Sequence, residues 1–326
     1  MKTRRLVGAV LGTFALASSV TACTQSSTAP ANTAAGLVSM KIANISVADT
    51  FPLYIAQDMG LFKDAGLSVE VSSAAANAAA VVPSVLNGEF QIGLAATPPF
   101  LNAVQKNIPI VGVAAAGAMV TNPSEDNAAI VVAKGSPIAG PKELAGRRVA
   151  VNALGSLVQV AGAALTTQSG GDASKIDWVA MPFPDMVGAL QQGRVDAILT
   201  VEPFLTAATQ DPGLQSVAAL YANTFPPQTT EAIYFSSKAY VASNRDAVQK
   251  FSQAMLRANE LAVQNPQLVR DALVKYGNYK PNVAQAVKLP VYPTQFNVEG
   301  MQQIADSMVR DGFLKKPIDV RSTLLQ

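Results

Sequence analysis

The 326-residue sequence contains no histidine and a single cysteine, Cys23. The absence of histidine excludes catalytic triads that use imidazole as a base, imidazole proton shuttles and histidine-ligated metals. One cysteine also cannot form an internal disulfide. Much of the enzyme chemistry that operates at neutral pH is therefore unavailable to this chain.

Charge is scarce as well, because only 14% of the residues are charged, with 24 Lys and Arg against 22 Asp and Glu. A chain without a large excess of positive charge is not expected to bind nucleic acid or other polyanions. In contrast, 49% of the residues are hydrophobic. A chain of this length can bury a large core, and it is expected to divide into about two domains.

The N-terminus has the pattern of an export signal. Lys2, Arg4 and Arg5 precede an apolar stretch over 6–20, which is shorter than a membrane span of about 20 residues and suits a signal-peptide core. The stretch ends in Val20-Thr21-Ala22-Cys23, which resembles the lipobox of bacterial lipoproteins. That resemblance implies cleavage after residue 22 and lipidation of Cys23, by palmitate among other chains. The alternative is an ordinary secretory signal with an incidental cysteine.

Residues 24–36 are small, polar and uncharged, which is typical of a flexible tether, so 23–39 is predicted to be the lipidated cysteine and its tether. Removal of 1–22 leaves 21 cationic against 22 anionic residues, a net charge of about −1. We expect the folded part to stand outside the cytoplasmic membrane, in the periplasm or on the outer face, held to the membrane through its lipid.

From residue 40 onward, strands and helices alternate at short spacing, which predicts an α/β fold with mostly parallel sheets. One set of elements is expected at 41–47, 52–59, 67–71, 75–86 and 90–95, and a second set in the same order at 148–152, 156–168, 176–181, 185–192 and 195–200. Short sequence segments repeat too, since Leu86-Asn87-Gly88 and Gln191-Gln192-Gly193 each precede a strand and a Pro-Phe pair. The pattern predicts two doubly wound lobes built on one plan.

Two turn-rich segments, 121–127 and 224–230, are expected to carry the chain from one lobe to the other and back. The predicted organisation is lobe 1 over 40–127, lobe 2 over 128–230, and a return to lobe 1 with C-terminal helices over 231–326. A helix over 244–265 carries one apolar stripe that should pack against lobe 1, formed by Val248, Phe251, Met255, Ala258 and Ala262.

A ligand site is expected between the lobes, because open parallel sheets bind ligands beyond the carboxyl ends of their strands. The loops at those ends span 49–52, 72–74 and 96–98 in lobe 1, and 153–156, 182–185 and 201–203 in lobe 2. The candidate ligand-binding residues on and beside these loops are Asp49, Thr50, Phe51, Tyr54, Ser73, Ala96, Thr97, Asn152, Gly155, Ser156, Leu157, Phe183, Asp185 and Glu202.

Several runs of this sequence resemble the nitrate, sulfonate and taurine-type substrate-binding proteins of ABC importers, a family that includes binders of thiamine-pyrimidine precursors. The runs cover 51–62, 66–70, 88–99, 143–150, 193–197 and 202–204. The resemblance implies a type II periplasmic-binding-protein fold, in which two lobes joined by two hinge crossings close around one small ligand. It further implies a monomer without cofactor, metal or nucleic acid, which delivers its ligand to a permease and an ATPase.

The charged residues of the candidate loops are Asp49, Asp185 and Glu202, with no Lys or Arg among them. Because charges that line a cleft should complement the ligand, a neutral or weakly cationic organic solute is favoured. Phe51 and Phe183, with Tyr54, are suited to stack on a ring or to cover an aliphatic chain. The alternative is a sulfonate or another small anion held by helix N-termini.

Several candidates also have a purely structural interpretation. Asp185 suits a helix N-cap, and Glu202 suits a brace of its loop and of the hinge. Phe51 and Phe183 could belong to the core, and Trp178, in the middle of an expected strand, is interpreted as core. Thr50, Thr97 and Ser156 are the safest polar candidates, because each opens an expected helix and offers a hydroxyl with its N–H.

Three functions fit this sequence. The first is a lipid-anchored receptor that captures a solute by hinge closure and presents it to a permease. The second is a sensory module that passes its ligand-bound form to a signalling partner. The third is an enzyme like the thiamine-pyrimidine synthases of the same fold. The resemblance implies that those enzymes use histidine and a cofactor-bearing lysine, so the missing histidine counts against it.

Overall fold

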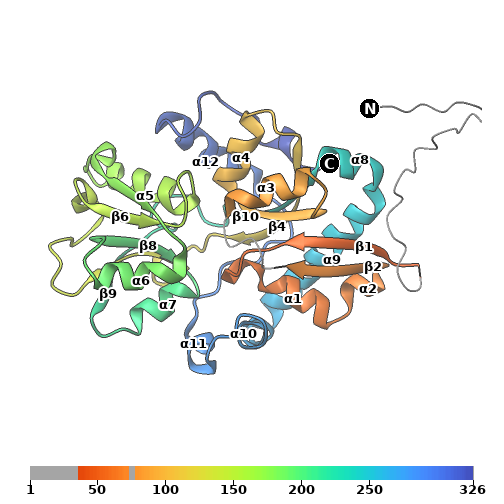
Figure 1. The fold of residues 1–326 in the computed structure, drawn as a ribbon, viewed down its shortest axis with the longest axis horizontal. Coiled ribbons are helices and arrows are strands. Elements are labelled where there is room, and N and C mark those ends of the chain that lie inside the picture. Colours follow the sequence, from red (N-terminus) through yellow and green to blue (C-terminus); the bar gives the residue numbers. More distant parts are fainter. Residues whose placement is uncertain (1–35, 73–77, 326) are drawn as a thin grey trace, which may run out of the picture. The chain divides into compact units, whose positions relative to one another are not determined.

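The computed structural model describes residues 36–72 and 78–325 (Figure 1). The expected signal segment 1–22, Cys23, the tether as far as residue 35, and Ser73 lie outside the described residues. Within the described ranges, no helix combines the length and the apolar character that a membrane crossing requires.

The first lobe is a five-stranded sheet between two layers of helices (Figure 1). Its strand order is β2-β1-β3-β10-β4, with β2, β1 and β3 parallel and β10 antiparallel to both of its neighbours. The strands are β1 (Val38–Ala43), β2 (Leu67–Ser72), β3 (Ile92–Ala96), β4 (Ile110–Ala118) and β10 (Thr230–Ser237). One face carries α1 (Phe51–Asp58), α2 (Leu61–Asp64) and α9 (Arg245–Gln264), and the other α3 (Ala78–Leu86), α4 (Thr97–Gln105) and α12 (Val298–Arg310).

Helix α9 contacts β4 and α1 through its expected apolar stripe, whose five members are all buried. Phe251 of this stripe stacks on Phe62 with ring centroids 5.8 Å apart and meets the edge of Tyr234 at 5.6 Å. Burial of one apolar stripe against a sheet stabilises a helix of this length, which explains why its charged residues face away. The prediction for this helix is confirmed.

The second lobe repeats the plan of the first with the strand order β7-β6-β8-β5-β9. Three parallel strands are again followed by one antiparallel strand, β5, and by a fifth strand. The strands are β5 (Ala128–Ala133), β6 (Arg148–Val151), β7 (Asp177–Ala180), β8 (Ala197–Val201) and β9 (Leu214–Ala219). Helix α5 (Leu157–Gln168) covers one face, and α6 (Phe183–Gln191) with α7 (Phe204–Thr209) covers the other (Figure 1).

Several element boundaries differ from the sequence expectation, and two of these differences have clear local reasons. Strand β1 begins at Val38 and ends at Ala43, because the Thr50 hydroxyl donates to the carbonyls of Ile45 and Val47 and holds 45–47 in a turn. Helix α6 begins at Phe183 with Pro in its first turn, a position that suits proline. Asp185 therefore lies inside the first turn rather than at the N-cap.

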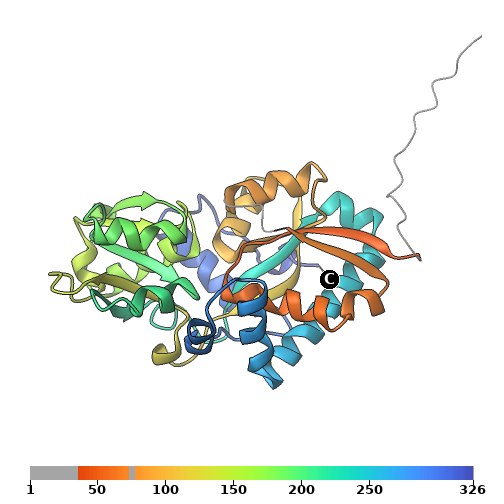
Figure 2. The ribbon, with the colours of Figure 1, turned by 60° about the horizontal axis from the view of Figure 1, so that its bottom comes forward.

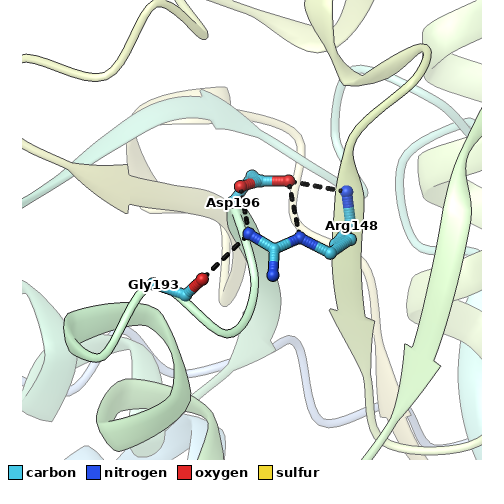
Figure 3. A network of polar contacts seen from close by, with 3 residues as sticks. All are labelled: Arg148, Gly193 and Asp196. Atoms are coloured by element: carbon cyan, nitrogen blue, oxygen red, sulfur yellow. Dashed lines mark hydrogen bonds and ion pairs between the residues drawn. The ribbon is translucent and has the colours of Figure 1, made fainter.

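The repeated segments 86–88 and 191–193 lie in similar surroundings in the two lobes, at the edge of each sheet where the parallel strands begin. The Arg148 side chain donates to both Asp196 carboxylate oxygens, at 2.8 and 3.3 Å, and to the Gly193 carbonyl at 2.8 Å (Figure 3). Lobe 1 has a related pair, in which the Lys41 N–H donates to Gln91 Oε1 at 2.8 Å and the Gln91 N–H donates back to the Lys41 carbonyl at 2.9 Å. The glycine of each repeated segment takes part, because the Gly88 carbonyl accepts from Gln91 Nε2 at 3.1 Å as the Gly193 carbonyl accepts from Arg148.

The chain passes from the first sheet to the second between β4 and β5, and back between β9 and β10. The two crossings lie side by side, because the carboxylate of Asp126 accepts from the N–H of Ala128 at 3.1 Å and from that of Ala222 at 2.8 Å. Met119 also donates its N–H to Thr229 and accepts from Gln228. The lobes are thus joined by two crossing segments that are hydrogen-bonded to each other, which is the arrangement of a hinge.

The C-terminal segment packs along both lobes. After α8 (Lys238–Ser243) and α9, helix α10 (Pro266–Lys275) packs on α1, and α11 (Pro281–Ala286) contacts α7 of lobe 2. Figure 2 shows these blue helices beneath the junction of the two lobes. Helix α12 then returns to α4 and β10. This segment therefore supports the junction from outside the two sheets.

Candidate functional site

A cavity of about 480 Å³ lies between the lobes. Lobe 1 lines it with the segment after β1, the end of β3 and the facing sides of α3 and α4, and lobe 2 lines it with the loop from β6 to α5, the start of α6 and the end of β8. The cavity thus lies beyond the carboxyl ends of strands in both sheets, where the topology places ligands. Its size is that of a site for one small organic molecule.

Seven of the residues expected at the site line this cavity: Asp49, Ala96, Asn152, Gly155, Ser156, Leu157 and Phe183. Within the β6–α5 loop, the N–H of Gly155 donates to Gln159 Oε1 at 2.6 Å, and Ser156 Oγ caps the helix by accepting from the Gln159 N–H at 3.4 Å. The positive φ of Gly155, 76°, favours glycine there. The loop is therefore fixed by its own helix.

Four other expected residues are buried in the body of lobe 1, outside the cavity lining. The Thr97 hydroxyl donates to the Thr230 carbonyl at 2.6 Å, and the Thr50 hydroxyl holds the turn after β1. Phe51 belongs to a hydrophobic cluster with α10, and Tyr54 stacks on Tyr276 with centroids 4.3 Å apart. For Phe51, the alternative interpretation as a core residue therefore fits the structure.

Glu202 lies between the lobes without lining the cavity. Its buried carboxylate accepts from the N–H and hydroxyl of Thr206 and from the N–H of Lys288, at 2.9 to 3.2 Å. Its carbonyl accepts from the N–H of Ala48 in lobe 1 at 3.1 Å. These contacts fit a brace between lobe 2, lobe 1 and the C-terminal segment. Asp185 is exposed on α6, outside the lining.

Sequence reasoning missed five polar residues of the cavity, Asn102 and Lys106 around the end of α4 and Asn127, Tyr221 and Glu231 near the crossings. Asn127 ends the first crossing, Tyr221 lies in the second, and Glu231 follows at the start of β10. Glu231 Oε1 accepts from Asn127 Nδ2 at 2.9 Å. A glutamate in a strand whose other residues are all uncharged is unusual, and this was the signal that could have found it.

Asp49 and Glu231 lie next to each other in the floor of the cavity, where their carboxyl groups are placed to share a hydrogen bond. Burial raises the pKa of Glu231 well above its ordinary value, and the neighbouring charge of Asp49 raises it further. Burial also raises the pKa of Asp49, although the hydrogen bond with Glu231 opposes that shift. A hydrogen bond between two carboxyls requires a proton on one of them. The pair is thus arranged to hold one proton between two acids.

The raised pKa values predict that the free protein is more stable at pH 5 than at pH 8. Between the unfolded pKa, about 4, and the raised folded pKa, the folded chain holds more protons than the unfolded chain, so stability falls as pH rises. The lowered pKa values of Asp58 and Asp196 change the free energy of unfolding only below about pH 4. The sequence contains no histidine that could titrate between pH 5 and pH 8. The nearby phenols of Tyr221, Tyr234 and Tyr292 have pKa values raised by burial and stay neutral across this range.

Urea unfolding at pH 5, 6.5 and 8 measures this slope, which is about 1.4 kcal/mol per pH unit for each extra proton bound. Glu231→Gln should reduce the slope and leave the part that comes from Asp126 and Glu202, whose pKa values burial also raises. Glu143→Gln, at an exposed position, should keep the wild-type slope. A free energy of unfolding that rises from pH 5 to pH 8 in the wild type would show that these buried carboxyls do not retain protons in the folded chain.

The sequence matches the family described as NMT1/THI5 like over residues 47–268. Among curated proteins, the 4-amino-5-hydroxymethyl-2-methylpyrimidine phosphate synthase of Candida albicans (strain WO-1) is 25% identical over 248 residues, which are 71% of this chain and 68% of that protein.

Two solved structures are similar over most of the chain. The periplasmic aliphatic sulphonate binding protein SsuA from Escherichia coli has a TM-score of 0.69 at 20% identity, covering 88% of this chain and 92% of its own. A Candida albicans protein that exhibits the generic periplasmic binding protein structural fold has a TM-score of 0.72 at 17% identity, covering 89% and 96%. The expected periplasmic-binding-protein fold, with two doubly wound α/β lobes, is confirmed.

Proposed function

Because this chain belongs to the NMT1/THI5-like family, we propose that it is the solute-binding protein of an ABC importer. It captures one small organic molecule, neutral or weakly cationic, and delivers it as a monomer to a permease and its ATPase. The observation that carries this proposal is the cavity of about 480 Å³ between the facing carboxyl ends of two sheets, whose lobes are joined by a hydrogen-bonded pair of crossings.

Capture couples to hinge closure, because a solute that touches both lobes stabilises the arrangement in which they approach. Leu86 of lobe 1 and Leu154 of lobe 2 both line the cavity, yet they are 40% and 66% exposed. Large apolar side chains exposed at a binding cleft are suited to cover an apolar ligand body. Closure over a solute would bury both of them and so would contribute to the affinity.

A binding role agrees with the absence of histidine from the sequence. The Candida albicans relative is named a synthase, so the test of the proposal measures turnover as well as binding. Candidate solutes are added to the purified full-length protein in mild detergent, its melting temperature is recorded, and the solute is analysed afterwards by mass spectrometry. Receptor function requires a solute that raises the melting temperature and is recovered unchanged, whereas conversion of that solute into a product contradicts it.

The lipid anchor is a separate element of the proposal, and Cys23→Ser tests it. Loss of the thiol removes the site of lipidation, so the variant should move from the membrane pellet to the soluble fraction, while a Ser27→Ala control stays with the membrane. Mass spectrometry of the N-terminal peptide checks for the lipid itself. A wild-type protein recovered as soluble chain without lipid would contradict the anchor and leave solute capture untouched.

A further inference from the structure

The floor of the cavity carries acceptor oxygens that lack donors. Asp49 Oδ1, Glu231 Oε2 and Asn127 Oδ1 are buried, and apart from the proton that the two carboxyls share, no donor in the described ranges reaches them. All three residues line the cavity, and each is more than nine-tenths buried. A buried acceptor without a donor costs about 1–3 kcal/mol, so the site is built for a ligand that brings N–H or O–H groups.

The charge at this floor is negative and is not balanced by the protein. Among the described residues, no Lys or Arg forms an ion pair with Asp49 or Glu231, and the cationic residue of the lining, Lys106, is exposed at the C-cap of α4. Two adjacent carboxyl groups that keep one proton between them carry a single negative charge. An unpaired buried charge is costly unless a partner of opposite sign enters the site.

The geometry favours an organic cation over a metal ion. No group of three or more acidic or cysteine side chains within the described ranges is placed to hold a metal. Around the polar floor, the walls are apolar, with Val82 and Leu86 from lobe 1 and Leu157 and Phe183 from lobe 2. A flat or aliphatic body fits these walls, and a head group with several N–H donors fits the floor.

We infer that the Asp49–Glu231 pair, with the Asn127 carbonyl beside it, recognises a monocationic head group that carries at least two N–H donors, such as an amidinium. This inference rests on the proposed function and names the class of solute that it would capture. The complex is electrically neutral, and the ligand's N–H groups supply the missing donors. Because Asn127 and Glu231 adjoin the two crossings, the head group binds at the hinge itself.

Three probes of one shape separate charge from size: benzamidine, which is a planar cation at pH 7, neutral benzamide and anionic benzoate. Titration calorimetry on the full-length protein at pH 7 should show benzamidine binding at least about tenfold more tightly than the other two. Asp49→Asn and Glu231→Gln should each weaken benzamidine by about tenfold or more. Urea unfolding of each variant, compared with that of the wild type, shows that the variant is folded.

The matched controls Asp64→Asn and Glu143→Gln remove the same charges from exposed positions outside the lining and should leave benzamidine binding unchanged. Tighter binding of benzoate or benzamide overturns the cation inference while leaving solute capture in place. Absence of binding by all three probes at about 10 mM overturns it as well. The proposed function fails on a different result, the chemical conversion of a bound solute.

Discussion

Phe51→Ala is expected to lower the free energy of unfolding by about 3–5 kcal/mol, the range for deletion of a buried phenylalanine. Phe51 is fully buried in the cluster that joins α1 to α10, with its ring 5.8 Å from that of Tyr54. Removal of the ring leaves a cavity that neighbours such as Leu273 can fill only in part. Urea unfolding at fixed pH measures the loss.

Phe183→Ala provides the contrast, because Phe183 is only partly buried and forms part of the cavity wall. Its ring stacks on Phe204 at 5.4 Å, a contact worth about 1 kcal/mol. We expect a small loss of stability with a clear loss of benzamidine affinity, whereas Phe51→Ala should lose stability foremost. The reverse pattern would place Phe51 at the ligand and Phe183 in the core.

Gly117→Ala is expected to displace Asp49 and to weaken benzamidine binding by at least about tenfold. A Cβ atom at Gly117 of β4 would lie 2.7 Å from Cγ and 2.9 Å from Cβ of Asp49, closer than folded proteins permit. The backbone around Asp49 resists movement, because Ala48 donates its N–H to the Glu202 carbonyl and accepts from the Tyr292 hydroxyl. The overpacking should also cost about 1–3 kcal/mol of stability.

Gly188→Ala is the matched control for this substitution. Gly188 lies inside α6, and an added Cβ there would meet nothing within 4 Å. Alanine in a helix interior is more favourable than glycine by about 1 kcal/mol, so this variant should be slightly more stable and should bind normally. Normal benzamidine affinity in Gly117→Ala would contradict the role of Asp49 at the floor of the cavity.

The sequence was sufficient to predict the fold because its signals are local and repeated. The spacing of strands and helices, the two turn-rich crossings and the apolar stripe of α9 each follow from short-range patterns. Ligands bind beyond the carboxyl ends of parallel strands, and this rule correctly placed Asn152 and Ser156 in the cavity lining. Both residues lie where β6 passes into α5. The limits of β1 were missed because the Thr50 hydroxyl, not hydrophobic periodicity, ends the strand.

The polar floor could not be predicted, because it assembles residues that are far apart in the chain. Asp49 and Glu231 are 182 positions apart and meet only because β10 inserts between β3 and β4. Phe51, two residues from Asp49, points into the core instead, since helix α1 turns it toward α10. Loop membership identifies the region of a site, but the direction of each side chain depends on packing between distant elements.

Native mass spectrometry of the protein as purified tests the central claim most directly, because it weighs the chain together with whatever occupies its cavity. The account predicts one bound small molecule per chain, which is released on unfolding and has an organic composition with a basic nitrogen. Loss of that adduct in Glu231→Gln, but not in Glu143→Gln, would place it at the floor of the cavity. A wild-type chain that carries no adduct and chemically converts added solutes would contradict the claim that this protein captures and releases a molecule unchanged.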